Sequence, residues 1–388
     1  MATTLPPGLH FAALVHATPR LGAALVPLNT RLAEREMREQ ERAGRARLTV
    51  SEPLTGPQMA VELRSDLDPG AVHTVLFTSG TTSKPKAVEL TSHNHAASAR
   101  ASTGNLGARE DDSWLCVLPL FHVGGLAILL RSAMNATTVV LHDGFDADSV
   151  RDALEGGQVT LVSLVSTMLH RLREAGLTQA PGLRALLLGG GPIPSSLLDW
   201  ANELELPVAP TYGMTETASQ VVTVSPAEAL QGLGAGHPLE GVDLRVAHDG
   251  EILVRGPMVA SGSLAPDGWL HTGDLGSLDS EGRLRVEGRR ASLIVTGGEN
   301  VMADEVEDAL RTHPAVVDAG VIGVLDEEWG ERVVAYVVRD GEVSEPELVQ
   351  LCRTRLGSYK APKEVNFVAE LPRNAAGKLV RGRLGARP

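Results

Sequence analysis

The stretch Thr78–Lys86 reads TSGTTSKPK, and it is the starting point for predicting the fold and the site of this chain. It follows AVHTVLF, residues 71–77, an apolar and β-branched run that predicts a buried strand ending at a polar loop. Only five of the 35 basic residues are lysines, at positions 84, 86, 360, 363 and 378, and two of these lie in the loop. A loop that concentrates a rare residue type among hydroxyl groups needs a chemical explanation.

The composition of this loop suits the binding of phosphate oxygens. Hydroxyl groups and loop N–H groups can donate hydrogen bonds, and a lysine adds a compact positive charge. The loop is not a Walker A loop, because the GxxxxGK[ST] spacing is absent. A surface loop with solvated lysines is the alternative interpretation, since Gly/Ser/Thr clusters are common loop material.

The bulk composition describes a globular protein of more than one domain. A length of 388 residues exceeds what one ordinary core supports, and 43% of the residues are hydrophobic. A net charge of −13 argues against binding to nucleic acid and to anionic membranes. Cys116 and Cys352 lie far apart without metal-ligand spacing, and the N-terminus lacks a signal-peptide pattern, so we expect a cytoplasmic protein.

Short apolar strands alternate with helical segments from the loop to about residue 225, and a helix is predicted to follow the loop at TSHNHAASARAS, residues 91–102. This alternation predicts βαβ units and a largely parallel sheet, so the fold class is α/β. After residue 225, turn sequences such as HDG and SEG predict a small antiparallel, β-barrel-like part. We expect an N-terminal domain of residues 1–288 and a small, mobile α+β C-terminal domain of residues 289–388, with a hinge at 289–292.

Four further segments carry polar groups typical of nucleotide sites: TYGMTETASQ (211–220), HTGDLG (271–276), EGRRASLIVTGGEN (287–300) and LPRNAAGKLVR (371–381). Glu216 could ligate Mg²⁺ beside a phosphate, although helix capping is the simpler interpretation of Thr215 and Glu216. Asp274 could accept both hydroxyl groups of a ribose, although an Asx-turn is the usual role of such an aspartate. The joint order of the segments is more specific than any one of them.

In this order the five segments resemble the adenylate-forming superfamily, which includes acyl-CoA synthetases, luciferases and peptide-synthetase adenylation domains. The resemblance runs from about Leu14 to the C-terminus. Within the superfamily the chain looks most like the o-succinylbenzoate–CoA ligases of menaquinone biosynthesis. The residues that carry this likeness are GAALVPLNTRL (22–32), LPLFHVGGLAILLRS (118–132), LLLGGGPIP (186–194) and TYGMTETASQVVTVSP (211–226).

The resemblance implies an acid–CoA ligase that works in two steps with ATP, Mg²⁺ and coenzyme A. In the first step the carboxylate of the substrate, expected to be 2-succinylbenzoate, attacks the α-phosphate of ATP and pyrophosphate leaves. The C-terminal domain then rotates about the hinge, and the CoA thiol displaces AMP. Positioning and charge neutralisation dominate such chemistry. The expected partners are small molecules, a homodimer is left open, and neither nucleic acid nor membrane is expected.

The resemblance also implies roles for individual residues. The β- and γ-phosphates would be held by Ser79, Thr81, Thr82 and Lys86, and adenine by Gly190, Gly191, Thr211 and Tyr212. Thr215 would contact the α-phosphate, Glu216 would ligate Mg²⁺, and Asp274 with Arg289 would bind the ribose. Lys378 would bridge the attacking carboxylate and the α-phosphate, and Gly297 with Gly298 would line the pantetheine path. The acid would be bordered by His122, Gly189, Ser219 and Gln220, although a buried, satisfied histidine is the rival interpretation of His122.

The chain departs from the family pattern at three places. Ala87 stands where the loop usually has glycine, Ala291–Ser292 replace the usual charged hinge residue, and the N-terminal part is abbreviated. These departures keep other functions open: a CoA ligase for another aryl or fatty acid, or a non-catalytic nucleotide-binding relative. An adenylation domain that loads a carrier protein is disfavoured, because no carrier segment with its serine follows Lys378.

Overall fold

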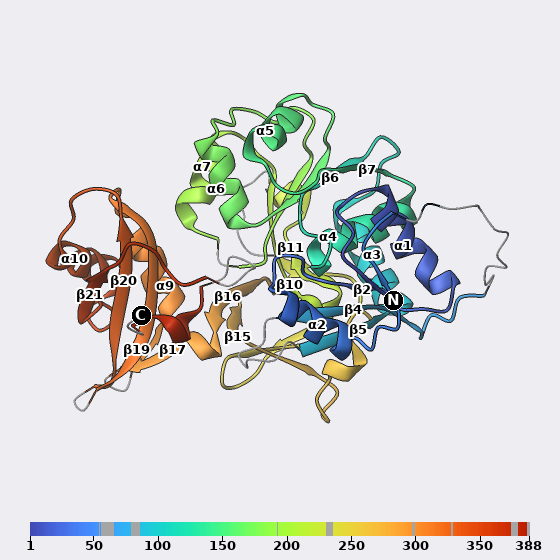
Figure 1. The fold of residues 1–388 in the computed structure, drawn as a ribbon. Coiled ribbons are helices and arrows are strands. Elements are labelled where there is room, and N and C mark those ends of the chain that lie inside the picture. Colours follow the sequence, from blue (N-terminus) through green and yellow to red (C-terminus); the bar gives the residue numbers. More distant parts are fainter. Residues whose placement is uncertain are drawn as a thin grey trace.

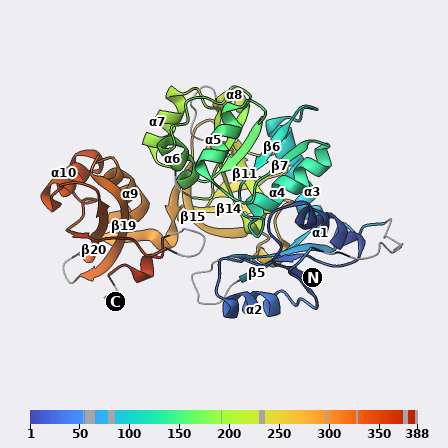
Figure 2. The ribbon, with the colours of Figure 1, turned by 45° about the horizontal axis from the view of Figure 1, so that its top comes forward.

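The computed structural model describes residues 1–53, 55, 66–78, 86–191, 193–229, 236–296, 299–326, 329–373 and 379–385. Figure 1 shows the C-terminal residues, in orange and red, gathered into a lobe beside a larger body that contains the N-terminus. Figure 2 shows the same separation from a second direction. Among the described residues, none of the helices combines the length and the apolar character needed to span a bilayer.

The larger body is built around a seven-stranded sheet in the order β12-β11-β10-β9-β8-β6-β7. Its strands are β6 (Ser113–Cys116), β7 (Thr138–Leu141), β8 (Leu161–Leu164), β9 (Ala185–Leu188), β10 (Val208–Met214), β11 (Ser219–Thr223) and β12 (His237–Pro238). Neighbours from β10 to β7 pair in parallel, whereas β11 and β12 are antiparallel. The α/β class and the largely parallel sheet predicted from the sequence are confirmed.

Successive side chains of the central strands enter two different cores, because a strand presents alternate residues to opposite faces. Leu186 and Leu188 of β9 pack with helices α5 (Ala147–Glu155), α6 (Ser166–Glu174) and α7 (Ser195–Glu203). Leu187 packs on the other face with α3 (Ser92–Leu106) and α4 (Val123–Asn135). Burial on both faces explains why these strands are continuous apolar runs such as ALLL.

The lysine-bearing loop joins two strands of a hairpin. β4 (Val72–Thr78) pairs antiparallel with β5 (Lys86–Thr91), and Thr78 lies opposite Lys86. The sequence predicts a helix at 91–102 and no element between it and the loop, and the structure places the six-residue strand β5 there. Val88 and Leu90 of β5 are buried on one face. The alternation of apolar and polar residues that marks a strand therefore extends over only two apolar positions, too few to predict it from the sequence.

Helix α3 begins at the residue after β5, where Thr91 and Asn94 form a capping box. Thr91 Oγ1 accepts from the Asn94 N–H at 3.1 Å, and Asn94 Oδ1 accepts from the Thr91 N–H at 2.9 Å. These two bonds satisfy backbone donors that the first turn of a helix leaves unpaired. The predicted helix start at the TSHNH segment is therefore confirmed, with the strand inserted before it.

Two smaller sheets complete the larger body. A three-stranded parallel sheet near the N-terminus contains β1 (Ala2–Thr3), β2 (Val26–Pro27) and β3 (Thr49–Val50), accompanied by α1 (Leu9–Arg20) and α2 (Glu34–Ala43). After α8 (Pro226–Ala229), an antiparallel sheet contains β13 (Asp243–Val246), β14 (Glu251–Arg255), β15 (Leu270–Leu278) and β16 (Leu284–Arg289). The antiparallel segment expected after residue 225 is thus present.

The C-terminal lobe has a separate hydrophobic core. Its elements are β17 (Leu293–Thr296), β18 (Glu299–Met302), α9 (Ala303–Arg311), β19 (Val316–Asp326), β20 (Gly330–Arg339), α10 (Glu345–Leu356) and β21 (Glu364–Phe367). Ile294, Leu310 and Val333 belong to one buried cluster that draws only on these elements. This agrees with the α+β unit predicted from the sequence, while the boundary near residue 288 and the hinge at 289–292 stay predictions.

The larger body and the lobe approach each other closely at Gly288, near the end of β16. A Cβ at this position would lie 2.6 Å from Met302 Cε and 2.8 Å from Asp304 Oδ2, and the backbone φ is +146°. A side chain would collide with the beginning of α9 and would also disfavour this backbone conformation. Glycine is therefore required where the chain leaves the antiparallel sheet.

A buried histidine pair lies between the N-terminal segments and α3. His73 donates from Nε2 to the Val15 carbonyl at 2.8 Å, and His95 Nε2 lies 2.8 Å from Thr74 Oγ1. The two rings meet edge to face with centroids 5.4 Å apart. Burial, and secondarily the neighbouring His73, lowers the pKa of His95 to about 3, so this ring is neutral in the folded protein at neutral pH.

This neutral ring predicts a specific loss of stability in acid. An unfolded histidine takes up a proton below its ordinary pKa of 6.5, whereas folded His95 does so only near 3, so stability is lost as the pH falls through this window. Urea unfolding followed by tryptophan fluorescence should show about 2 kcal/mol less pH dependence between pH 7.5 and pH 5.0 in His95→Asn than in the unmutated protein.

The control for this measurement is His10→Asn, because His10 is exposed on α1. This variant should keep the pH dependence of the unmutated chain. An identical pH dependence in His95→Asn and in His10→Asn would contradict the conclusion that the neutral ring of His95 causes the loss of stability in acid.

Candidate active site

Two segments that lie far apart in the sequence meet at the ends of β5 and β10. Lys86 begins β5, and Glu216 lies in the short 3₁₀ helix η1 (Thr215–Thr217) that follows β10. The Lys86 Nζ is 3.9 Å from the Glu216 Oε1. The Lys86 side chain is 58% exposed and that of Glu216 is 15% exposed, so the pair borders solvent and a ligand can reach it.

The turn that carries Glu216 is fixed by several hydrogen bonds. Thr217 Oγ1 accepts from the Met214 N–H at 3.0 Å and is 2.7 Å from the Ser219 carbonyl, to which it can donate. The Glu216 carbonyl accepts from the Ala260 N–H at 2.8 Å. Ala218 and Ser219 have positive φ values of 51° and 122°, which reverse the chain into β11. The turn is thus held in a conformation that non-glycine residues rarely adopt.

The carboxyl group of Asp274 on β15 accepts a hydrogen bond from the seven-stranded sheet and so joins that sheet to the antiparallel sheet. The residue is 5% exposed, and its carboxyl group accepts from the Tyr212 hydroxyl at 2.9 Å and pairs with Arg289 Nε at 2.9 Å. Tyr212 belongs to β10, and Arg289 lies directly opposite Asp274 in the β15–β16 ladder. Burial, together with the charge of Asp274, raises the pKa of the Tyr212 phenol, which remains a hydrogen-bond donor.

The three glycines after β9 lie beside β10. A Cβ on Gly189 would be 2.6 Å from the Thr211 carbonyl oxygen, so this glycine lets the two chain segments approach closely. Gly190 has a φ of +81°, a left-handed conformation that favours glycine. The structure therefore brings Gly189, which was expected to border the acid, against Thr211, next to Tyr212, and Gly190 follows it in the chain. The binding of adenine by Gly190, Gly191, Thr211 and Tyr212 stays a prediction.

Gln220 is not brought to this surface. Its side chain is 3% exposed and lies in the core between α3, α4 and β11. With its amide oxygen toward Arg131, it accepts from both guanidinium Nη atoms at 3.1 and 3.3 Å, and its amide nitrogen donates to Thr223 Oγ1. These contacts leave no exposed amide for a substrate. The preceding residue, Ser219, is partly exposed at the turn, and its predicted place beside the substrate acid stays a prediction.

Arg131 is the functional-site neighbour that sequence reasoning missed. Its side chain is 2% exposed, its Cζ lies 4.8 Å from the Trp114 ring centroid, and no ion pair joins it to any acid in the described part of the chain. The only sequence signal was a charged residue inside the apolar helical run LAILLRSAM. Through Gln220 and Thr223, which bonds Thr211 Oγ1 at 2.8 Å, this cation is connected to the back of the expected adenine site.

His122 occupies the N-cap position of α4, the helix that also carries Arg131. Its ring meets the Phe121 ring edge to face with centroids 4.7 Å apart, and its side chain is neither fully buried nor fully exposed. The next turn of the helix is tightly packed, because a Cβ on Gly125 would lie 2.6 Å from the Leu118 and Pro119 carbonyl oxygens. This position allows His122 to border a pocket, and its role stays a prediction.

Several predicted site residues lie outside the described residues: Ser79, Thr81, Thr82, Gly297, Gly298 and Lys378. Among the residues that are described, no group of three or more His, Cys, Asp and Glu side chains could hold a metal ion by itself. A magnesium ion bound with a nucleotide needs fewer protein ligands, because it commonly uses one or two carboxylates together with phosphate oxygens. The single carboxylate of Glu216 fits that mode of binding.

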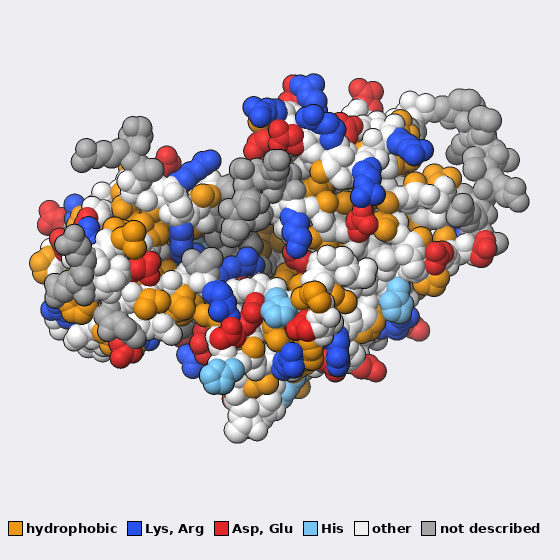
Figure 3. Space-filling model, turned by 90° about the horizontal axis from the view of Figure 1, so that it is seen from below, with side chains coloured by type: hydrophobic (Ala, Val, Ile, Leu, Met, Phe, Trp, Pro, Cys, Tyr) orange, Lys and Arg blue, Asp and Glu red, His pale blue; other side chains and the backbone are white. Residues whose placement is uncertain are grey.

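Local cations must attract an anionic ligand here, because the protein as a whole is negative. The net charge is −13, and on the face drawn in Figure 3 basic and acidic side chains are interspersed. Lys86 and Arg289 each lie at the site with more than half of the side chain exposed. Their charges act at short range, where screening by salt is weakest.

Two family models of nucleotide-binding enzymes match the sequence of this chain. The family model described as AMP-binding enzyme matches residues 54–264, and the model of the AMP-binding enzyme C-terminal domain matches residues 305–378. The chain belongs to the AMP-binding enzyme family. The second match begins inside the C-terminal lobe, and the two matches leave the segment with β15, β16 and the expected hinge between them.

The relatives of this AMP-binding enzyme include a CoA ligase and two synthetases of known structure. A 2-succinylbenzoate–CoA ligase of Bacillus cereus is 41% identical over 420 residues, a match that covers 99% of this chain and 87% of the relative. The structure of the o-succinylbenzoate CoA synthetase of Bacillus subtilis in complex with its acyl-adenylate intermediate is 38% identical, with a TM-score of 0.92, covering 100% of this chain and 88% of that one. An amide bond synthetase of Marinactinospora thermotolerans is 27% identical, with a TM-score of 0.87, over 99% of this chain and 88% of that one.

The position of Asp274 predicts how its loss affects nucleotide binding. Asp274→Asn retains the size of the side chain but removes the charge that pairs with Arg289 and accepts from Tyr212. We expect the affinity for ATP, measured by equilibrium titration, to fall about tenfold, which corresponds to about 1.4 kcal/mol. Asp279→Asn is the matched control, because Asp279 pairs with Arg283 in the exposed turn after the same strand. Equal losses in the two variants, or none in the first, would refute the role of Asp274.

Proposed function

We propose that this AMP-binding enzyme is an AMP-forming acid–thiol ligase that converts 2-succinylbenzoate to its CoA thioester. It uses MgATP and coenzyme A and releases AMP and pyrophosphate, in menaquinone biosynthesis. The observation that carries the proposal is the meeting of Lys86 and Glu216, 3.9 Å apart, in a chain that matches 2-succinylbenzoate–CoA ligases over 99% of its length. We place the enzyme in the cytoplasm, and a homodimer remains part of the proposal to be tested.

The first step joins the acid to AMP. A carboxylate oxygen of the acid attacks the α-phosphorus, the bond to the bridging oxygen of the β-phosphate breaks, and pyrophosphate carries away the electron pair. Lys86 would neutralise charge on the leaving phosphates, and Thr215, the first residue of the turn that carries Glu216, would contact the α-phosphate. Glu216 would hold Mg²⁺, which supplies charge neutralisation when bound with the nucleotide.

The ribose and adenine would be fixed by the neighbouring strands. Asp274 is oriented by Arg289 and Tyr212, so its carboxyl oxygens can accept hydrogen bonds from the ribose hydroxyl groups without reorganisation. Thr211, Tyr212 and the glycines after β9 form the adjoining surface for the base. In this proposal the α-phosphate would lie beside Thr215 and the acid beside His122.

The second step transfers the acyl group to coenzyme A. The thiol sulfur attacks the acyl carbonyl carbon, loses its proton, and AMP leaves with its phosphate oxygen. Lys378, which lies outside the described residues, belongs to the first step in this proposal, and Gly297 with Gly298 to the second. In this proposal the C-terminal lobe changes its orientation about the hinge at 289–292 between the two steps.

The identity of the acid is tested by a substrate panel. Pyrophosphate release and mass spectrometry of the thioester should show turnover of 2-succinylbenzoate at least about tenfold above benzoate and medium-chain fatty acids, because a second carboxylate gives an additional charged contact. Equal rates would indicate a ligase for another aryl or fatty acid. Absence of acid-dependent ATP–pyrophosphate exchange with every acid would indicate a non-catalytic relative.

The proposed division of labour between the steps is tested at Lys378. Lys378→Ala should lose acyl-adenylate formation by a factor of about 10² or more, since it removes the charge that bridges the two reacting anions. The same variant should convert synthetic acyl-adenylate and coenzyme A to thioester at nearly the rate of the unmutated enzyme. A comparable loss in both half-reactions would contradict the assignment.

A further inference from the structure

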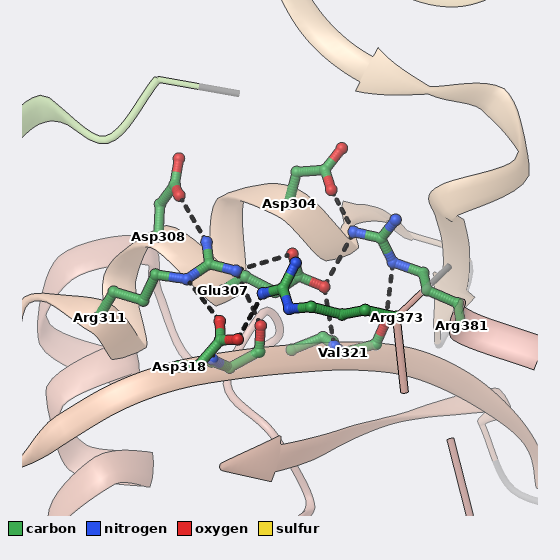
Figure 4. Close-up of polar contacts among 9 residues, drawn as sticks. Asp304, Glu307, Asp308, Arg311, Asp318, Val321, Arg373 and Arg381 are labelled. Carbon is green, nitrogen blue, oxygen red and sulfur yellow. Dashed lines mark hydrogen bonds and ion pairs between the residues drawn. The ribbon is translucent and has the colours of Figure 1, made fainter. Parts of the chain in front are cut away.

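A cluster of charged side chains fixes the C-terminal tail, the part of the chain that follows β21, to α9, the first helix of the lobe. Figure 4 shows three arginines, from α9 and from the tail, interleaved with four acids of α9 and β19. The arginines are Arg311, Arg373 and Arg381, and the acids are Asp304, Glu307, Asp308 and Asp318. We call this set the tail cluster. Nothing in the proposed chemistry uses it directly.

Arg381 forms the more buried half of the tail cluster. Its guanidinium pairs with Asp304, lies 2.8 Å from Glu307 Oε1, and donates from Nε to the Val321 carbonyl at 3.3 Å. Glu307 is 3% exposed and also accepts from the Val321 N–H at 2.9 Å. The arginine is therefore held through three groups on two elements, a geometry that defines its direction as well as its position.

Arg373 forms the second half, at the opposite end of the same tail segment. Its Nη2 pairs with Asp318 Oδ2 at 2.5 Å, and Asp318 also pairs with Arg311. The backbone of Arg373 forms a β-bridge with Leu379, and the Val380 N–H donates to the Pro372 carbonyl at 2.8 Å. The chain thus enters the segment 374–378 and leaves it at two residues that are paired with each other.

Apolar packing holds the same tail from the other side. Leu379 and Leu384 both lie against Gly320 of β19, where a Cβ would be 3.1 Å from each leucine side chain. A larger residue at position 320 would push the tail away from the strand. The tail is therefore attached by ion pairs at Arg373 and Arg381 and by leucine contacts between and beyond them.

The energetics favour a cluster that forms completely. Burial raises the pKa of Glu307 to about 7, against the opposing effect of the Arg381 guanidinium first and of Arg311 second. A buried carboxyl group that loses one of these partners is left with an uncompensated desolvation cost. Removing Arg381 would therefore leave the buried carboxyl group of Glu307 without its main cationic partner, which disfavours detachment of the tail.

From these contacts we propose that Arg373 and Arg381 are positioning residues that hold the two ends of the segment carrying Lys378, so that the lysine reaches the α-phosphate during adenylation. The inference rests on the proposed function, because Lys378 has its role only there. It follows from connectivity: Lys378 is adjacent to Leu379, and the bonded residues Arg373 and Arg381 bracket it in the sequence. Loosening either end lets the ammonium group move relative to the reacting atoms, and displacement by about 1 Å can cost about 10² in rate.

The test compares the two half-reactions in variants of the whole enzyme. Arg381→Met should lower the rate of acyl-adenylate formation about tenfold or more, while thioester formation from synthetic acyl-adenylate and coenzyme A should stay within about twofold. Arg381→Lys, which keeps a positive charge for Glu307, should recover part of the adenylation rate. A general loss of folding would lower both half-reactions together.

The control is Asp308→Asn, because Asp308 belongs to the tail cluster but contacts Arg311 at 3.0 Å and is paired with neither tail arginine. Both half-reactions should remain near those of the unmutated enzyme. Adenylation that is unchanged in Arg381→Met, or that falls as much in Asp308→Asn as in Arg381→Met, would overturn the proposal.

A second variant keeps the test decisive if Arg381→Met does not fold, which circular dichroism would show. Arg373→Met changes the more exposed end, where the side chain is 37% exposed, and should give the same selective loss of adenylation. Equal loss in both half-reactions of folded Arg373→Met would overturn the proposal. If the unmutated enzyme forms no acyl-adenylate from any acid, the proposed function fails instead, which is a separate result.

Discussion

The buried carboxylate of Asp274 is the constraint on which the arrangement of the site depends. It accepts from Tyr212 on the seven-stranded sheet and pairs with Arg289 on the neighbouring antiparallel strand, each at 2.9 Å. An acid that is 5% exposed can remain charged only with such partners, so the two sheets are held in one relative position. Since Arg289 is the last residue of β16, the same contact fixes the point from which the chain departs toward the C-terminal lobe.

A second constraint lies behind the site, in the core shared by α3, α4 and β11. The guanidinium of Arg131 is buried against Trp114 and is satisfied by the oxygen of Gln220 rather than by an acid. Burial lowers the pKa of Arg131 to about 10, which still leaves it charged at neutral pH. Through its hydrogen bonds to Gln220, Arg131 helps to fix β11, the strand that follows the Glu216 turn.

Much of the fold and part of the site could be predicted from the sequence, because they depend on local pattern. The strands ALLL and VHTVLFT, the helix start at Thr91 and the antiparallel strands after residue 225 are written in short stretches of sequence. Strand β5 was missed because only Val88 and Leu90 display its period of two. The position of Gln220 could not be predicted, since a polar residue next to a glutamate-bearing motif points equally well to the ligand or to the core.

The sequence by itself determined the polar inventory of the site and its order along the chain: the lysine-bearing loop, Glu216, Asp274, Arg289 and the late lysine at 378. Only the tertiary structure decided which of these groups share a surface. Lys86 and Glu216 meet because the start of β5 lies near the end of β10, and Arg381 contacts Glu307 because the tail packs on α9 and β19. Electrostatic and hydrogen-bond energies depend on distances of a few ångströms, and those distances are set by long-range packing that no local pattern records.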